Sequence, residues 1–385
     1  MIPASEQDSF LDDVIKDIGQ LFVFGFAGKE LDDDALYLLK EKNACGVILF
    51  ARNIESLEQV VALNASVVNA CTEEYPALIS VDQEGGRVAR LRGICTDVVS
   101  MRSLGKHAID DNDLPYRVGA MMARELAALG FHMDFAPVVD VDTNPKNPVI
   151  GERSFSRDAN EVCVFSAQFI RGMQQAGIAA SAKHFPGHGD TDTDSHTCLP
   201  TLPHDLARLE DVELRPFQSA IAAGVATIMT AHVLFPALDA EHPATLSEKV
   251  LHALLRQKLG YQGVIISDDL EMAGVAEHYE VEEMVVKGLE AGVDLFLICH
   301  TPGKVRRAIA AVEKALRDEV LSPARVAESL SRIRALKERF VGAPAAPTLE
   351  EATAIVRCGP HQKLIQEIQE QDSDQKRPSS FVDDA

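Results

Sequence analysis

The feature that most restricts the fold is the alternation of short apolar segments with longer amphipathic ones. Stretches with helical periodicity include 56–70, 114–129, 160–176, 213–223, 247–259 and 281–291. They separate eight β-prone segments, at 20–26, 46–50, 77–81, 132–139, 178–182, 226–230, 263–267 and 294–299. A strand and a helix that alternate eight times predict an α/β fold, the (β/α)8 barrel of TIM type.

Length leaves the number of domains open, because the chain has 385 residues and barrels of this kind often reach such a size as one unit. We predict a single catalytic domain over residues 1–340. The sequence changes character at Ala-Pro-Ala-Ala-Pro, residues 343–347. Residues 341–385 are therefore expected to form a C-terminal extension that is partly helical, with a disordered polar end.

Charge and cysteine usage restrict the partners and the compartment. A net charge of −22 argues against binding to nucleic acid or to an anionic membrane and favours a small substrate. The seven cysteines form no C-x-x-C pair, which favours a reducing compartment. The first twenty residues do not resemble a signal peptide, and no apolar run reaches membrane-spanning length. We predict a soluble cytoplasmic protein, either a monomer or a weak dimer.

Chemically versatile residues follow the predicted strands, where barrel enzymes place their active sites. They are Asp82, Asp140, Asp142, His184, His232, Asp268 and Asp269.

The richest of these loops runs from Lys183 to His196, with the sequence KHFPGHGDTDTDSH. The spacing of Asp194 and His196 allows the carboxylate to orient a proton-transferring imidazole. A solvated turn would explain the aspartates but not the histidines. A metal site built from His184, His188, Asp190 and His196 is a further alternative, although the spacing matches no established metal motif.

Paired carboxylates end the seventh predicted strand in the sequence ISDDLEM, residues 266–272. A carboxylate such as Asp268 can attack the anomeric carbon of a sugar if a second group protonates the leaving oxygen. His196, oriented by Asp194, is a candidate for that group. The alternative for Asp268, and equally for Asp269, is a helix N-cap.

Two further segments supply groups that suit sugar hydroxyls. Residues 80–90 contain Asp82 and Arg90, and residues 144–155 contain Arg153. Taken alone, the first could be a glycine turn with a surface ion pair, and the second a rigid turn.

Together, segments 82–90, 144–155, 183–196 and 267–272 resemble the β-N-acetylglucosaminidases of glycoside hydrolase family 3, over roughly residues 15–340. The resemblance implies a retaining exo-hydrolase of terminal β-linked N-acetylglucosamine, in bacteria often on anhydromuropeptides from peptidoglycan recycling, with no metal or other cofactor. It implies Asp268 as nucleophile and His196 as acid/base with Asp194 as its partner. The positions that hold the terminal sugar are Asp82, Arg90, Arg153, Lys183 and His184.

Two segments depart from the family pattern. Residues 93–99 lack its Phe and Pro residues, and the extension after Val341 has no counterpart in the shortest members. A β-glucosidase on the same scaffold stays open, because recognition of the N-acetyl group rests on inferred contacts. A glycoside phosphorylase also stays open, since a neutral histidine base repels phosphate less than a carboxylate does. A non-catalytic sugar sensor and a metal-dependent hydrolase are the alternatives of other classes.

Overall fold

The structure is a computed structural model that describes residues 4–193, 199–343 and 345–375. Within them, eight parallel strands close into a barrel in the order β1-β10-β9-β8-β7-β6-β3-β2. The strands are β1 Phe22–Phe24, β2 Gly46–Leu49, β3 Leu78–Val81, β6 Met133–Asp134, β7 Ala179–Phe185, β8 Thr227–Thr230, β9 Val264–Asp269 and β10 Leu295–Ile298. The predicted (β/α)8 barrel is confirmed.

Two strands differ in length from the prediction. β6 pairs only at Met133 and Asp134 before Pro137, which has no backbone N–H, and the chain then rejoins β7 through a bridge between Val138 and Lys183. β7 continues three residues past the predicted end and includes Lys183 and His184. These two polar residues stay in the strand because their side chains have charged partners inside the barrel.

Helices surround the barrel, and several begin at the caps that the sequence indicates. Ser56 accepts a hydrogen bond from the Gln59 N–H at the start of α3, and Asp158 accepts one from Asn160 at the start of α6. The α-helices up to residue 340 are α1 Ala4–Lys16, α2 Asp33–Lys40, α3 Leu57–Ala70, α4 Met101–Ala108, α5 Leu114–Ala128, α6 Ala159–Gln175, α7 Leu206–Arg208, α8 Leu214–Ala222, α9 Ala273–Ala276, α10 Val281–Ala291, α11 Pro302–Arg317 and α12 Pro323–Phe340. The 3-10 helices are η1 Ile18–Leu21, η2 Ala51–Asn53, η3 Gly151–Arg153 and η5 Ala244–Leu246. The π-helices are η4 Leu209–Glu213 and η6 Lys249–Lys258.

A small hairpin stands at the end of the barrel where β3 finishes. β4 Gln83–Gly85 pairs antiparallel with β5 Val88–Ala89. Gly85 and Gly86 form the turn with φ angles of 92° and 54°, which side chains of L-residues rarely permit. The hairpin thereby turns the chain back so that Glu84 and Arg90 border the same cavity.

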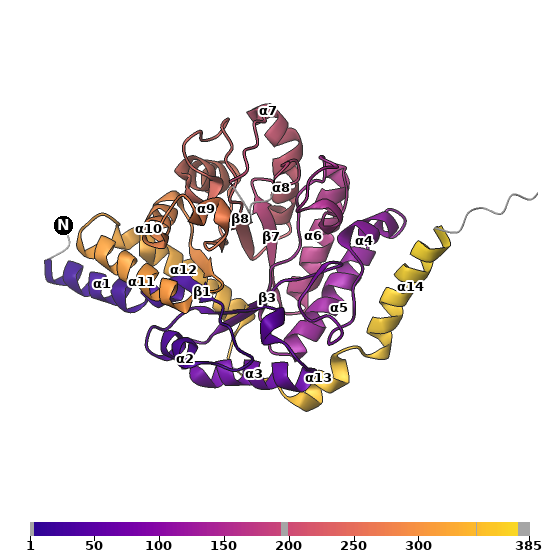
Figure 1. The fold of residues 1–385 in the computed structure, drawn as a ribbon, viewed down its shortest axis with the longest axis horizontal. Coiled ribbons are helices and arrows are strands. Elements are labelled where there is room, and N and C mark those ends of the chain that lie inside the picture. The colour runs from indigo at the N-terminus through magenta and orange to yellow at the C-terminus, as the bar shows by residue number, and fades with distance from the viewer. Residues whose placement is uncertain (1–3, 194–198, 344, 376–385) are drawn as a thin grey trace, which may run out of the picture.

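The C-terminal extension packs against the outside of the barrel (Figure 1). It contains α13 Leu349–Ile355, which contacts α3 and α5, and α14 Gly359–Gln375, which contacts α4. Ile365 and Ile368 of α14 are buried in the main core. The domain boundary at residue 340 stays a prediction, and the expected disordered end, residues 376–385, lies outside the described residues.

Within the described ranges, no helix combines the length and apolar character needed to cross a bilayer.

Candidate active site

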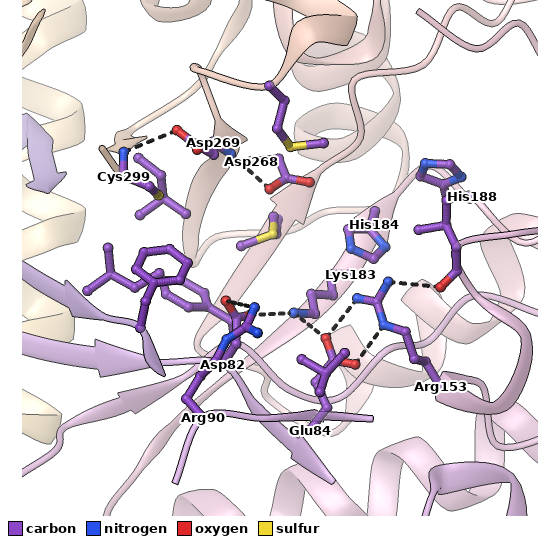
Figure 2. A pocket seen from close by; sticks show the side chains of 18 of the residues that line it. Asp82, Glu84, Arg90, Arg153, Lys183, His184, His188, Asp268, Asp269 and Cys299 are labelled. Carbon is purple, nitrogen blue, oxygen red and sulfur yellow. Dashed lines mark hydrogen bonds and ion pairs between the residues drawn. The ribbon is translucent and has the colours of Figure 1, made fainter. Parts of the chain in front are cut away.

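A cavity of about 320 Å³ opens at the carboxyl ends of the barrel strands (Figure 2). Its polar lining comes from five strand ends and the loops that follow them. These residues are Asp82, Glu84, Arg90, Arg153, Lys183, His184, His188, Asp268, Asp269, Cys299 and His300. Apolar walls complete it, among them Phe50, Phe135, Met229 and Met272.

One side of the cavity is a charged cluster of Asp82, Glu84, Arg153 and Lys183 (Figure 2). Arg153 binds the Glu84 carboxylate through two bonds, Nε to Oε2 and Nη2 to Oε1, each 2.8 Å long. Lys183 Nζ lies 2.6 Å from Glu84 Oε1 and 2.8 Å from Asp82 Oδ1. The cluster therefore holds two fixed cations and two carboxylates in a geometry suited to hydroxyl and amide groups.

Mutual attraction keeps this cluster ionised despite its burial. Burial acts to raise the pKa of Glu84, but the adjacent Arg153 and Lys183 outweigh it and hold this pKa well below its ordinary range. Burial likewise acts to lower the pKa of Lys183, and the carboxylates of Asp82 and Glu84 reverse the effect and raise it. Both groups are thus charged at neutral pH.

Arg90 lies beside Asp82 Oδ2, the carboxylate oxygen that Lys183 does not contact. Its Nη2 lies 3.8 Å from Asp82 Oδ2, and its guanidinium carbon lies 5.6 Å from the centre of the Phe50 ring. The Arg90 side chain is 32% exposed, so part of its guanidinium remains open to the cavity. Arg90 thus offers a cation and an adjacent aromatic face to a ligand.

Asp140 positions two histidines. Its carboxylate accepts the backbone N–H of His188 at 2.7 Å and the backbone N–H of His184 at 3.2 Å, and it lies 2.7 Å from His184 Nδ1. The Nδ1 of His188 contacts Thr191 Oγ1 at 2.7 Å, and burial lowers the pKa of His188 to about 4. His188 is therefore neutral at neutral pH, and the His184 ring is fixed on the cavity wall.

Asp268 lies at the end of β9 and faces the charged cluster across the cavity (Figure 2). Its Oδ1 accepts the Asp269 backbone N–H at 2.8 Å. Burial acts to raise the pKa of Asp268, but His184, His232, this N–H and Lys183 outweigh burial and lower the pKa below its ordinary value. A buried, ionised carboxylate at this place has the charge state that a nucleophile requires.

The alternative that Asp268 or Asp269 caps a helix is wrong, since the residue before α9 is Met272. Asp269 Oδ1 instead accepts the backbone N–H groups of Glu271 at 3.0 Å and Cys299 at 3.1 Å, which joins β9 to the end of β10. Burial raises the pKa of Asp269 to about 7. The pKa values of the two adjacent aspartates are therefore shifted in opposite directions, below the ordinary value for Asp268 and above it for Asp269.

The structure brings six of the eight predicted site residues to this cavity: Asp82, Arg90, Arg153, Lys183, His184 and Asp268. The other two, Asp194 and His196, lie outside the described residues. Of the described residues that flank them, Asp190 Oδ2 lies 2.5 Å from His204 Nε2, and Asp190 Oδ1 accepts the Thr143 hydroxyl at 2.9 Å.

The sequence assigned no catalytic or sugar-binding role to Glu84, Asp140 or His188, although Asp140 was expected at a strand end and His188 was considered as a metal ligand. Glu84 stands two positions after Asp82, a spacing that in extended chain places both side chains on the same side. Asp140 follows a predicted strand, as Asp82 does. The spacing of Asp82 and Glu84 and the position of Asp140 after a strand are both visible in the sequence. Neither pattern indicates which partner the carboxylate would contact.

In the described part of the chain, no group of three or more His, Cys, Asp or Glu residues is arranged to hold a metal ion. His184, His188 and Asp190 of the metal-ligand set considered above are separately bonded to Asp140, Thr191 and His204. His196, its fourth member, is outside the described ranges.

Comparison with known proteins places the chain among sugar hydrolases. Residues 12–336 match the glycosyl hydrolase family 3 N terminal domain. The chain is 34% identical to beta-hexosaminidase A of Pseudoalteromonas piscicida over 82% of its own length and 57% of that protein's length. It is 40% identical to a beta-hexosaminidase of Stenotrophomonas maltophilia strain K279a, covering 76% of this chain and 87% of that one.

A solved structure extends the similarity to three dimensions. The family 3 beta-N-acetylglucosaminidase from Paenibacillus sp. strain FPU-7 superimposes with a TM-score of 0.86 and 42% identity, over 92% of this chain and 68% of that chain.

Proposed function

The chain belongs to glycoside hydrolase family 3, and from this membership we propose that it is a retaining exo-β-N-acetylglucosaminidase. One observation carries the proposal: the ionised Asp268 carboxylate shares a small cavity with the charged cluster of Asp82, Glu84, Arg153 and Lys183. A nucleophile thus faces the groups that would grip a terminal sugar.

Binding comes first. The carboxylates of the cluster would accept hydrogen bonds from sugar hydroxyls, while Arg90, Arg153, Lys183 and His184 would act as donors. Because the cluster is tightly bonded within itself, it is preorganised and does not need to rearrange around the ligand.

Chemistry follows in two steps. In the first, Asp268 attacks the anomeric carbon and forms a glycosyl ester, and His196 donates its proton to the departing oxygen. In the second, His196 takes a proton from water, whose oxygen attacks the same carbon and releases Asp268. Asp194 orients His196 and favours its imidazolium form before the first step.

The substrate that we propose is a terminal β-linked N-acetylglucosamine on a muropeptide or another cell-wall fragment, with the reaction in the cytoplasm. The cavity is small, about 320 Å³, which suits one terminal sugar better than an internal chain. The six cysteines among the described residues are all unpaired, which is in keeping with a reducing compartment.

The test is turnover of an aryl β-N-acetylglucosaminide by the wild type, Asp268→Asn and the control Asp33→Asn, an exposed position on α2. We expect activity in the wild type and control, loss in Asp268→Asn, and labelling of Asp268 by a slow 5-fluoro sugar. A wild type that is inert on β-glycosides, or a fully active Asp268→Asn, would refute the proposal.

Two additional arms settle the specificity. Faster turnover of the corresponding glucoside would identify a β-glucosidase. Sugar 1-phosphate formed on addition of inorganic phosphate would identify a phosphorylase.

A further inference from the structure

Residues 91–108, here called the bridging segment, lie against both loops that supply the Glu84–Arg153 pair. On the Glu84 side, the Gly86 N–H donates to the Val98 carbonyl at 3.0 Å, and a Cβ on Gly85 would meet the Val99 oxygen at 2.8 Å. The hairpin carrying Glu84 is therefore in direct backbone contact with the bridging segment.

On the Arg153 side, the contact comes from α4, the last part of the bridging segment. Arg102 donates from Nε to the Ser154 carbonyl and from Nη2 to the Gly151 carbonyl, both at 3.3 Å. Gly105 packs on the Phe155 carbonyl so closely that a Cβ would lie 2.2 Å from it. The bridging segment thus touches residues on both sides of Arg153.

The C-terminal extension fastens the start of the bridging segment through Glu125, a residue of α5 that is only 1% exposed. Glu125 accepts the backbone N–H and the hydroxyl of Thr96, each at 2.7 Å. The same carboxylate accepts the Arg357 N–H at 2.9 Å and lies 2.8 Å from His361 Nδ1. Arg357 also donates from Nη1 to the Gly93 carbonyl at 2.8 Å.

The extension also holds the far end of the bridging segment. Asp372 of α14 lies 3.0 Å from His107 Nε2 and accepts the Ser103 hydroxyl, so both partners belong to α4. The extension therefore contacts the bridging segment directly at Gly93, Ser103 and His107, and it reaches Thr96 through Glu125. These contacts join residues 93–99 to the region after Val341, the two stretches that were expected from the sequence to differ from the family pattern.

We infer that the C-terminal extension positions the Glu84–Arg153 pair through the bridging segment, with Glu125, Arg357 and His361 as positioning residues. The inference rests on the proposed function insofar as that pair binds the sugar. A bidentate guanidinium–carboxylate pair tolerates little displacement, because both of its bonds depend on the relative placement of the two loops. Loosening the extension should therefore weaken sugar binding at a distance.

The test compares the full-length variants His361→Ala and Arg357→Ala/His361→Ala with two controls. His361→Asn keeps an N–H donor near the position of Nδ1. Lys363→Ala removes an exposed side chain of the same helix whose ion-pair partner is Glu367, also on α14.

Hydrogen exchange measured by mass spectrometry tests whether the extension affects the loops that carry Glu84 and Arg153, and it does not require an active enzyme. We expect faster exchange in the alanine variants at residues 83–108 and 150–155 as well as in the extension, and exchange like the wild type in both controls. Acceleration confined to residues 349–375 would overturn the inference.

Steady-state kinetics on the aryl glycoside supply the second readout. Weaker sugar binding that is equal in the ground and transition states raises KM and leaves kcat unchanged. We expect about a five- to tenfold rise in KM for the double variant, kcat within about twofold, and recovery in His361→Asn. A wild type without turnover would refute the proposed function alone, because the exchange pattern still decides the coupling; an unchanged KM in an active double variant would overturn the inference.

Discussion

Glu84 and Arg153, 69 residues apart in sequence, form a buried ion pair with two bonds of 2.8 Å. Glu84 belongs to the hairpin after β3 and Arg153 to the turn η3 that precedes α6. Lys183 contributes a second cation to the same carboxylate at 2.6 Å. The pair therefore fixes three parts of the barrel mouth relative to one another and defines one wall of the cavity.

Removing the Glu84 charge should cost both stability and affinity. Glu84→Gln leaves two buried cations short of a carboxylate, so we expect a loss of about 3 kcal/mol or more in the free energy of unfolding. KM should rise as well, since Arg153 and Lys183 lose their common anchor. Urea unfolding and kinetics on the aryl glycoside measure the two effects.

The matched control is Glu74→Gln, in an exposed ion pair with Lys16. It should leave unfolding and KM unchanged. Equal effects of the two substitutions would contradict the anchoring role of Glu84.

Asp269 should make stability depend on pH between about 4 and 7. Its pKa of about 7 in the folded protein lies above the unfolded value of about 3.9, so the folded state binds more protons in this range. Its contribution is therefore fully present below pH 4 and is lost as pH rises through 7, by up to about 1.4 kcal/mol per pH unit. In Asp269→Asn this component disappears.

Urea unfolding of the wild type and of Asp269→Asn at several pH values between 4.5 and 8 measures this pH-dependent contribution to the free energy of unfolding. The difference in unfolding free energy between wild type and Asp269→Asn should change with pH; parallel curves would show that Asp269 titrates normally.

The close approach of β2 and β3 at Gly46 should not accept a side chain. A Cβ there would lie 1.8 Å from the backbone oxygen of Leu78, and neither strand can move without disturbing the barrel. We expect Gly46→Ala to destabilise the protein by about 3 kcal/mol or more.

Gly303→Ala is the control, because a Cβ on this residue of α11 meets nothing within 4 Å. That substitution should be neutral or stabilise the helix by up to about 1 kcal/mol. Thermal unfolding of both variants provides the comparison, and a Gly46→Ala variant as stable as the wild type would contradict the close approach of the two strands at this position.

Cys299 should resist alkylation although it lines the cavity. Burial, followed by the carboxylate of Asp269, raises the pKa of its thiol well above the ordinary value, and the thiolate is the reactive form. Iodoacetamide at pH 7.5 should label Cys299 at least about a hundredfold more slowly in the folded protein than in urea. Peptide mass spectrometry gives both rates, and comparable rates would contradict the buried, neutral thiol.

Local patterns predicted most of the framework. The alternation of apolar and amphipathic segments indicated all eight strands, and α10 begins and ends where its periodicity predicts, at Val281 and Ala291. The placement of Asp82 and Asp268 at strand ends follows from the barrel itself, because parallel strands bring their carboxyl ends together. The roles of Asp194 and His196 stay predictions.

Contacts between distant loops were not predictable in this way. Glu84 was not predicted as a site residue, although it binds both Arg153 and Lys183, and the sequence did not indicate which part of the barrel the extension contacts. Which cation a carboxylate meets depends on the turn of the hairpin at Gly85 and on the angle at which loops leave the barrel.

The sequence by itself therefore determined the barrel, the strand ends that carry the reactive side chains and the family to which the chain belongs. These depend on hydrophobic periodicity and short motifs, which act within a few residues of one another. Only the tertiary structure decided that Asp140 holds His184 and His188, that the pKa values of Asp268 and Asp269 shift in opposite directions, and that Glu125 links the extension to Thr96. Each of these depends on burial and on distances between segments far apart in the chain, and those quantities exist only once the barrel has closed.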